Sequence, residues 1–176
     1  MGDFTSTLLS RPVNISRYAA IYASGGKNLG PSGFVVVIVK KDLIGPEAAS
    51  PRTPSVLNWH LHAASQPIPS IYNTPPVLPI YLHSLVLADL KARGGLDAVK
   101  ERVERRARLI FHEVDISEGY YIMKVQDNDH RSRMNVPLVI GDGAARRRDL
   151  EEKFVRDATA KDMHQLFGHP VRGGLR

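Results

Sequence analysis

The chain contains no cysteine among its 176 residues. Disulfides and thiolate chemistry are therefore excluded, and this composition suits a reducing compartment, so we expect a cytoplasmic protein. No apolar run approaches the ~20 residues of a membrane-spanning helix. No basic-then-apolar secretory leader opens the chain. We therefore expect no membrane partner.

Two common ligand-binding signatures are also missing. The phosphate-binding spacing G-x-x-x-x-G-K-[ST] fails around Lys27, because Ile21 stands where the first glycine belongs and Asn28 follows the lysine. The seven histidines are scattered, and no carboxylate or second pair joins His60 and His62 to complete a zinc site. The sequence predicts no metal site.

Basic residues exceed acidic ones, 24 to 18, which gives a formal charge of +6 and a pI near 9.7. Such a balance suits nucleic acid, an anionic membrane surface or anionic small molecules. However, arginines alternate with glutamates over residues 101–108, and Arg146–Arg148 precede three acidic residues, both of which indicate solvated surface. No aromatics interleave with the basic residues, as they do in single-strand binders. We expect anionic small molecules as partners, and no nucleic acid.

The first part of the chain carries a strand, a glycine-rich turn and a strand over residues 19–40. Phe34–Val39 is too uniformly β-branched for a half-exposed strand, so it predicts a strand covered on both faces in a parallel-type sheet. Residues 42–76 are rich in proline and are either a linker or an ordered loop that carries function. Two strands make a narrow sheet, so a partner or further chain must cover its apolar edges.

The second part alternates helices with strands. We expect a helix over 77–93, because an apolar stretch ends at the helix stop Gly94-Gly95. We expect amphipathic helices over 96–114 and 150–163, where apolar residues gather on one side, and strands over 120–125 and 134–140. The chain then divides near residue 75, into a sheet-bearing segment 1–75 and an α+β segment 76–176. The overall fold class is α/β.

Lys27 is the candidate for chemistry, because it lies in a glycine-rich turn between two strands, where small neighbours leave room for a flat ligand. A lysine held in this way can deliver its amine to a carbonyl cofactor. The alternative is a surface hairpin with a solvated lysine. Asp3 has a similar alternative as a helix cap or surface charge. Asn73-Thr74-Pro75-Pro76 is most simply a capped helix entry, and His169 and Arg176 lie in a glycine-rich tail that is open to disorder.

Taken together and in order, these motifs resemble phosphoserine aminotransferase, a class-V family of fold-type I enzymes that use pyridoxal 5′-phosphate. The residues that carry the resemblance are Asp3, Leu9-Ser10-Arg11-Pro12-Val13, Gly25-Gly26-Lys27-Asn28-Leu29-Gly30-Pro31-Ser32-Gly33, Thr53-Pro54-Ser55-Val56-Leu57, Tyr72-Asn73-Thr74-Pro75-Pro76, Arg131-Ser132-Arg133-Met134-Asn135-Val136-Pro137, Gly168-His169 and Gly173-Gly174-Leu175-Arg176. The resemblance covers essentially the whole chain, but only about the second half of a typical family member.

The resemblance implies a role for each candidate. Lys27 matches the lysine that binds the cofactor as a Schiff base and shuttles the substrate proton. Asp3 matches the carboxylate that pairs with the pyridinium nitrogen. Asn73 and Thr74 match the pair that reaches the cofactor phosphate of the other subunit, which implies a homodimer. The cofactor-binding residues are thus Asp3, Lys27, Asn73 and Thr74.

The tail would bind substrate. His169 matches a residue near the substrate phosphate, and Arg176 matches the arginine that clamps the amino-acid carboxylate. Two departures stand out: Gly26 replaces the glutamine usual before the lysine, and Pro170 replaces the arginine usual after the histidine, with Arg172 two positions further on.

The implied function is transamination between glutamate and 3-phosphohydroxypyruvate, giving O-phosphoserine and 2-oxoglutarate in L-serine biosynthesis. Residues 1–75 would be part of the large cofactor-binding domain, and residues 76–176 the small domain with the substrate-binding tail. The alternative is a truncated, non-catalytic member of the family that acts only as a folding or interaction module.

Overall fold

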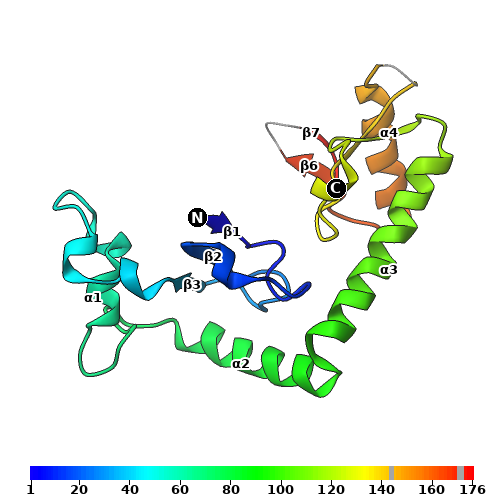
Figure 1. The fold of residues 1–176 in the computed structure, drawn as a ribbon. Helices are drawn as coiled ribbons and strands as arrows, with labels where there is room; N and C mark the ends of the chain where they lie inside the picture. The colour runs from blue at the N-terminus through cyan, green and yellow to red at the C-terminus, as the bar shows by residue number, and fades with distance from the viewer. Residues whose placement is uncertain (143–144, 170–172) are drawn as a thin grey trace. The chain divides into compact units, whose positions relative to one another are not determined.

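The computed structural model describes residues 1–142, 145–169 and 173–176 (Figure 1). It forms two compact units, Met1–Val99 and Lys100–Arg176. Helices and two separate sheets make up these units, so the α/β class is confirmed. The predicted domain boundary near residue 75 concerns the complete family fold and stays a prediction.

The sheet of the first unit has the order β1 (Gly2–Asp3), β2 (Ala20–Ser24), β3 (Val35–Val39). The predicted strand–turn–strand is confirmed as β2 and β3. These two strands run antiparallel, while β1 runs parallel to β2. The predicted parallel-type sheet is therefore wrong for this pair, because the connection from residue 25 to 34 is too short for the crossover that parallel strands need.

β3 is covered on one face only. Val36 and Ile38 pack against a core of Phe4, Ile21, Ala23 and Leu29. The alternate residues Val35 and Val37 face away from this core. Val35 is 59% exposed and Val37 37%. Burial on both faces, predicted from the β-branched run, is wrong in this chain, because the described residues supply a packed layer to alternate positions only.

The proline-rich segment is ordered locally rather than extended throughout. It contains short 3-10 turns at Lys41–Leu43, Pro46–Ala48 and Ser55–Leu57, like the earlier one at Ile15–Arg17. It also contains α1 (Trp59–Ala63), which sequence periodicity missed. The Asn58 side chain accepts hydrogen bonds from the amides of His60 and Leu61, and this cap begins the helix.

The helix predicted over 77–93 is confirmed as α2 (Val77–Ala92). Its N-cap is Pro76, with no side-chain hydrogen bond, so a cap by Asn73 or Thr74 is wrong. α2 is apolar around its whole circumference, as expected of a helix with several packed faces. Even so, no helix among the described residues is long and apolar enough to cross a membrane.

The helices predicted over 96–114 and 150–163 are confirmed as α3 (Gly95–Ile116) and α4 (Arg148–Thr159). In α3 the buried side chains Val99, Val103 and Ala107 recur every four residues, which makes one apolar stripe. The stripe confirms the amphipathic pattern read from the sequence.

The sheet of the second unit is antiparallel, with the order β4 (Tyr121–Met123), β5 (Leu138–Ile140), β7 (Gly173–Leu175), β6 (Phe167–His169). A 3-10 turn, Asn128–His130, lies between β4 and β5. The two predicted strands are confirmed at shorter length. β6 and β7, which form in the tail, were not predicted. α4 packs against β5 and β7.

Candidate active site

The turn that carries Lys27 is held by its own backbone. The amide of Gly25 donates to the Phe34 carbonyl (3.0 Å), that of Gly26 to the Gly30 carbonyl (2.7 Å), and that of Gly30 to the Lys27 carbonyl (2.9 Å). The first two bonds enclose the lysine, and the third closes the tight turn that follows it. The turn is therefore a defined structure and not a flexible link between β2 and β3.

Two neighbouring glycines serve this turn in different ways. A Cβ on Gly25 would lie 2.0 Å from the Pro31 carbonyl oxygen, so close approach of the backbone requires glycine there. A Cβ on Gly26 would meet open space, but Gly26 has φ of +116°, which side chains disfavour. The glycine that replaces the usual glutamine thus has a backbone reason in this chain.

Asp3 lies at the end of β1, in register with Tyr22 of β2. Its Oδ1 accepts a hydrogen bond from the Thr5 amide at 2.9 Å. This bond, with hydrogen bonds from the hydroxyls of Thr5 and Tyr22, lowers the pKa of Asp3 below its usual value. The same carboxylate raises the pKa of the Tyr22 hydroxyl. Asp3 is therefore an ionised carboxylate at neutral pH, while Tyr22 keeps its proton.

Thr5 and Ser6, which follow Asp3, connect it to the end of β2 and to Lys27 at the same edge of the sheet. The Thr5 hydroxyl oxygen accepts from the Ser24 amide (3.3 Å), and the Ser6 hydroxyl oxygen accepts from Lys27 Nζ (3.1 Å). This follows from the topology, because β1 and β2 are parallel and their carboxyl ends meet at one edge. The Lys27 side chain is exposed. Amine and carboxylate are thus placed on neighbouring segments that are hydrogen-bonded to each other.

The other predicted residues belong to other segments of the chain. Asn73 and Thr74 are exposed, in the connection between α1 and α2 of the first unit. His169 is in β6 and Arg176 follows β7, both in the second unit and both exposed. Pro170 and Arg172 lie outside the described residues.

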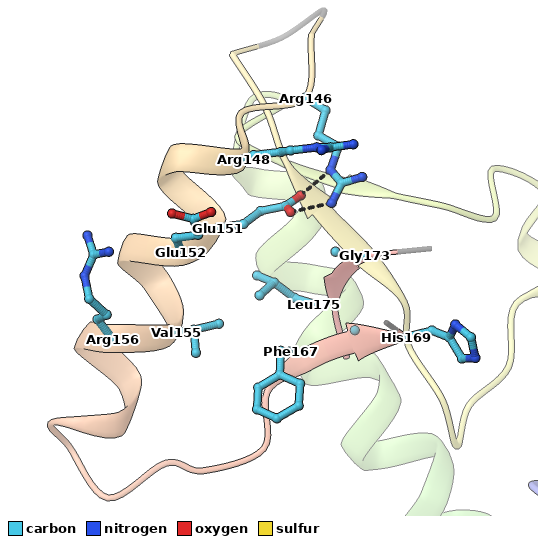
Figure 2. Close-up of a pocket in the computed structure, with 12 residues that line it drawn as sticks. Arg146, Arg148, Glu151, Glu152, Val155, Arg156, Phe167, His169, Gly173 and Leu175 are labelled. Carbon is cyan, nitrogen blue, oxygen red and sulfur yellow. Dashed lines mark hydrogen bonds and ion pairs between the residues drawn. The ribbon is translucent and has the colours of Figure 1, made fainter. Parts of the chain in front are cut away.

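An ion pair that sequence reasoning missed lies against the tail that bears Arg176. Arg146 Nε donates to Glu151 Oε1 at 2.8 Å and Arg146 Nη2 to Oε2 at 2.6 Å, and both residues line the cavity shown in Figure 2. The Ile140 amide lies 3.4 Å from Oε1 as a further donor. The Arg146 hydrogen bond lowers the pKa of Glu151, whose side chain is 9% exposed. The available signal was the run Arg146–Arg148 followed by three acidic residues, which was interpreted as solvated surface.

Gly173 fits closely beneath this pair. Lys124 Nζ donates to the Gly173 carbonyl at 2.6 Å, and a Cβ on Gly173 would lie 2.5 Å from Arg146 Nη2. The amide of Arg176 then donates to the Leu166 carbonyl at 3.1 Å. Together these contacts fix β7 and the start of Arg176 beside a cavity of about 750 Å³ between α4 and the β6–β7 hairpin.

The residues around Lys27 fit pyridoxal 5′-phosphate in their chemistry. A primary amine is needed to bind its aldehyde, and an ionised carboxylate is needed to pair with its ring nitrogen. Lys27 and Asp3 supply both at one sheet edge, with Ser6 and Thr5 between them. By contrast, no group of three or more His, Asp or Glu side chains in the described ranges is placed to hold a metal ion.

Comparison with known proteins gives consistent matches. The family model for aminotransferase class V matches residues 1–155. Phosphoserine aminotransferase of Laribacter hongkongensis is 41% identical over 174 residues, which are 99% of this chain and 45% of the relative. Phosphoserine aminotransferase 2, chloroplastic, of Arabidopsis thaliana is 39% identical over all of this chain and 39% of its own length.

Solved structures agree with these matches. A phosphoserine aminotransferase from Bacillus circulans subsp. alkalophilus has a TM-score of 0.84 at 38% identity, over 99% of this chain and 45% of its own. A phosphoserine aminotransferase from Trichomonas vaginalis, solved with pyridoxal phosphate bound, has a TM-score of 0.84 at 29% identity, over 98% and 47%. The chain spans less than half the length of these relatives. With most of its length matched by the family model, the chain belongs to the class-V aminotransferase family.

Proposed function

We propose that this chain carries the lysine-bearing part of a phosphoserine aminotransferase that uses pyridoxal 5′-phosphate. The amino group of glutamate would pass to 3-phosphohydroxypyruvate, which leaves 2-oxoglutarate and gives O-phosphoserine for L-serine biosynthesis. The observation that carries the proposal is the hydrogen-bonded edge that holds the Lys27 amine and the Asp3 carboxylate on neighbouring segments. The 41% identity to a phosphoserine aminotransferase supports the choice of substrate class.

Each residue then has a defined task. When bound, the cofactor supplies the aldehyde that accepts the amino group and an electron-withdrawing ring. Lys27 would hold that aldehyde through Nζ, and its amine would hold and return the proton of the substrate α-carbon. Asp3, which is ionised at neutral pH, would accept a hydrogen bond from the ring nitrogen and so favour the electron-withdrawing form of the ring.

The remaining residues bind anionic groups. Arg176 would hold the substrate carboxylate through its planar guanidinium, and His169 would lie near the substrate phosphate. Asn73 and Thr74 would reach the cofactor phosphate of a partner subunit, in a homodimer in the cytoplasm. These four residues are exposed, as ligand-binding side chains must be before the ligand arrives.

Covalent trapping tests the proposal. Purified chain is incubated with pyridoxal 5′-phosphate, reduced with borohydride, digested and analysed by mass spectrometry. We expect the cofactor mass on the peptide that contains Lys27, its loss in Lys27→Ala, and no change in Lys91→Ala, which removes an exposed lysine of α2. Equal labelling of many lysines, unaffected by Lys27→Ala, would contradict a specific site.

The alternative to an enzyme is a non-catalytic module, because the chain spans only 45% of the Laribacter relative. A non-catalytic member of the family would retain the fold and interaction surfaces without binding the cofactor. The trapping experiment separates the two: a folded chain that gains no label at Lys27 favours the non-catalytic module. Adding a polypeptide with the remaining part of the relative then asks whether labelling and transamination appear together.

A further inference from the structure

One face of α2 packs directly on the turn that carries Lys27. A Cβ on Gly30 would lie 3.2 Å from Val86 Cγ2, and one on Gly33 would lie 3.2 Å from Pro79 Cγ. Pro79, His83 and Val86 follow one another at spacings of four and three, so they share a helix face. His83 is at the centre of this face, and it is the one side chain of the three with a polar group.

His83 makes a polar contact on the C-terminal side of Lys27. Its Nδ1 lies 2.5 Å from the carbonyl oxygen of Leu29, two residues after the lysine. A carbonyl oxygen only accepts, so Nδ1 carries the proton and donates. Leu29 is itself 3% exposed and belongs to the core of this unit. The contact therefore joins α2 to a fixed point of the turn.

His83 also makes a ring contact with Phe34, the residue that follows the turn and pairs with Gly25 on the N-terminal side of Lys27. Its imidazole lies 4.7 Å from the Phe34 ring, centroid to centroid, at an angle of 38°. The Phe34 ring in turn lies against Gly25, two residues before the lysine, where an added Cβ would be 2.9 Å from Phe34 Cε1. The Phe34 carbonyl accepts from the Gly25 amide at 3.0 Å. The imidazole thus contacts the turn directly at Leu29, and it is linked to Gly25 on the other side of Lys27 through Phe34.

We propose that His83 is a positioning residue for Lys27. The Nδ1–H bond holds the turn at Leu29, and the ring, through Phe34, holds it at Gly25. The exposed lysine between these points starts from a backbone fixed on both sides, which reduces the freedom its amine loses on reaching a carbonyl. This bracing of the turn by His83 exists in the chain without any ligand. That it speeds the reaction of the Lys27 amine with a carbonyl rests on the proposed function.

The bracing is tested by amide hydrogen exchange, resolved by NMR, in two variants of the full chain. His83→Phe keeps a ring but loses the donor, whereas His83→Asn loses the ring but keeps an N–H donor near the position of Nδ1. His112→Phe, at an exposed histidine of α3, is the matched control. In His83→Phe we expect exchange at Gly26 and Gly30 to rise about tenfold, because one net hydrogen bond is lost. His83→Asn should change it about threefold or less, and His112→Phe should not change it.

Two results would overturn the bracing. One is exchange at Gly26 and Gly30 that stays within about twofold of the wild type in His83→Phe. The other is an equal rise throughout β2 and β3, since that would report general loss of stability and not release of the turn.

The chemical consequence has a separate readout, the rate at which pyridoxal 5′-phosphate and borohydride label Lys27. We expect His83→Phe to slow labelling of Lys27 about tenfold, as for one lost hydrogen bond, with labelling of Lys91 unchanged. Unchanged labelling of Lys27 in this variant would refute the positioning role. If the wild type gains no label at Lys27, the proposed function fails, while the exchange experiment still decides whether His83 braces the turn.

Discussion

At the scale of single residues, the candidate site depends on backbone as much as on side chains. Lys27 lies where it does because Gly25 allows the Pro31 carbonyl to approach and Gly26 adopts φ of +116°. The glutamine that the resemblance leads us to expect before the lysine is replaced by a glycine whose φ suits this turn. A side chain at Gly26 would have space, and only the dihedral angle opposes it.

Gly26→Gln is therefore expected to destabilise the chain, although it restores the residue usual in the family. A non-glycine residue held at such a φ costs about 1–3 kcal/mol of the free energy of unfolding. Denaturation by urea, followed by circular dichroism, measures the change. The matched control is Gly45→Ala, because Gly45 has φ of −61° and open space around its Cβ position. A neutral Gly26→Gln would show that the turn relaxes easily into another conformation.

At the scale of elements, the sequence was sufficient wherever periodicity decides structure. α3 and α4 follow from apolar spacing, and α2 follows from an apolar stretch that ends at Gly94-Gly95. β2 and β3 follow from an apolar run and a β-branched run on either side of a glycine-rich turn. β6 and β7 could not be predicted, because three-residue strands that contain Gly168, Gly173 and Gly174 have no strand propensity and exist through pairing. The contacts that fix them, from Lys124 and Arg146, join residues distant in sequence. The Asp3–Lys27 edge was found by family resemblance, and His83 by no sequence signal.

The Arg146–Glu151 pair carries the prediction that belongs to this scale. Glu151→Gln leaves Arg146 facing an amide with one acceptor, so we expect the free energy of unfolding at pH 7 to fall by about 1–3 kcal/mol. The folded pKa of Glu151 lies below its ordinary value of 4.5. Its contribution is therefore present above pH 4.5 and is lost as the pH falls through the lowered pKa.

Urea titrations of wild type and Glu151→Gln at several pH values measure this effect. The stability difference between them should be largest near neutrality and should shrink in acid. Asp89→Asn is the control, since it breaks the exposed pair with Arg93, whose side chains are 67% and 58% exposed, and such pairs contribute little. A difference between wild type and Glu151→Gln that does not depend on pH would mean that packing alone, and not the ionised pair, holds β7.

At the scale of the whole molecule, the exposed apolar surface of α2 is the dominant feature. Val77, Leu78, Tyr81 and Leu85 are 68%, 66%, 58% and 48% exposed. An exposed apolar surface of this kind promotes association.

We therefore expect the purified chain to self-associate, with a mass that rises with concentration when measured by light scattering after size exclusion. The double variant Leu78→Lys and Leu85→Lys should lower that mass, because it places charge on the apolar surface of α2. Ser84→Lys with Ala88→Lys is the matched control: both residues are exposed on α2, and the added charge is the same, but no large apolar side chain is removed. If both double variants dissociate the assembly equally, net charge governs association and the apolar contact does not. If only the leucine variant does, α2 is the surface through which copies of this chain associate.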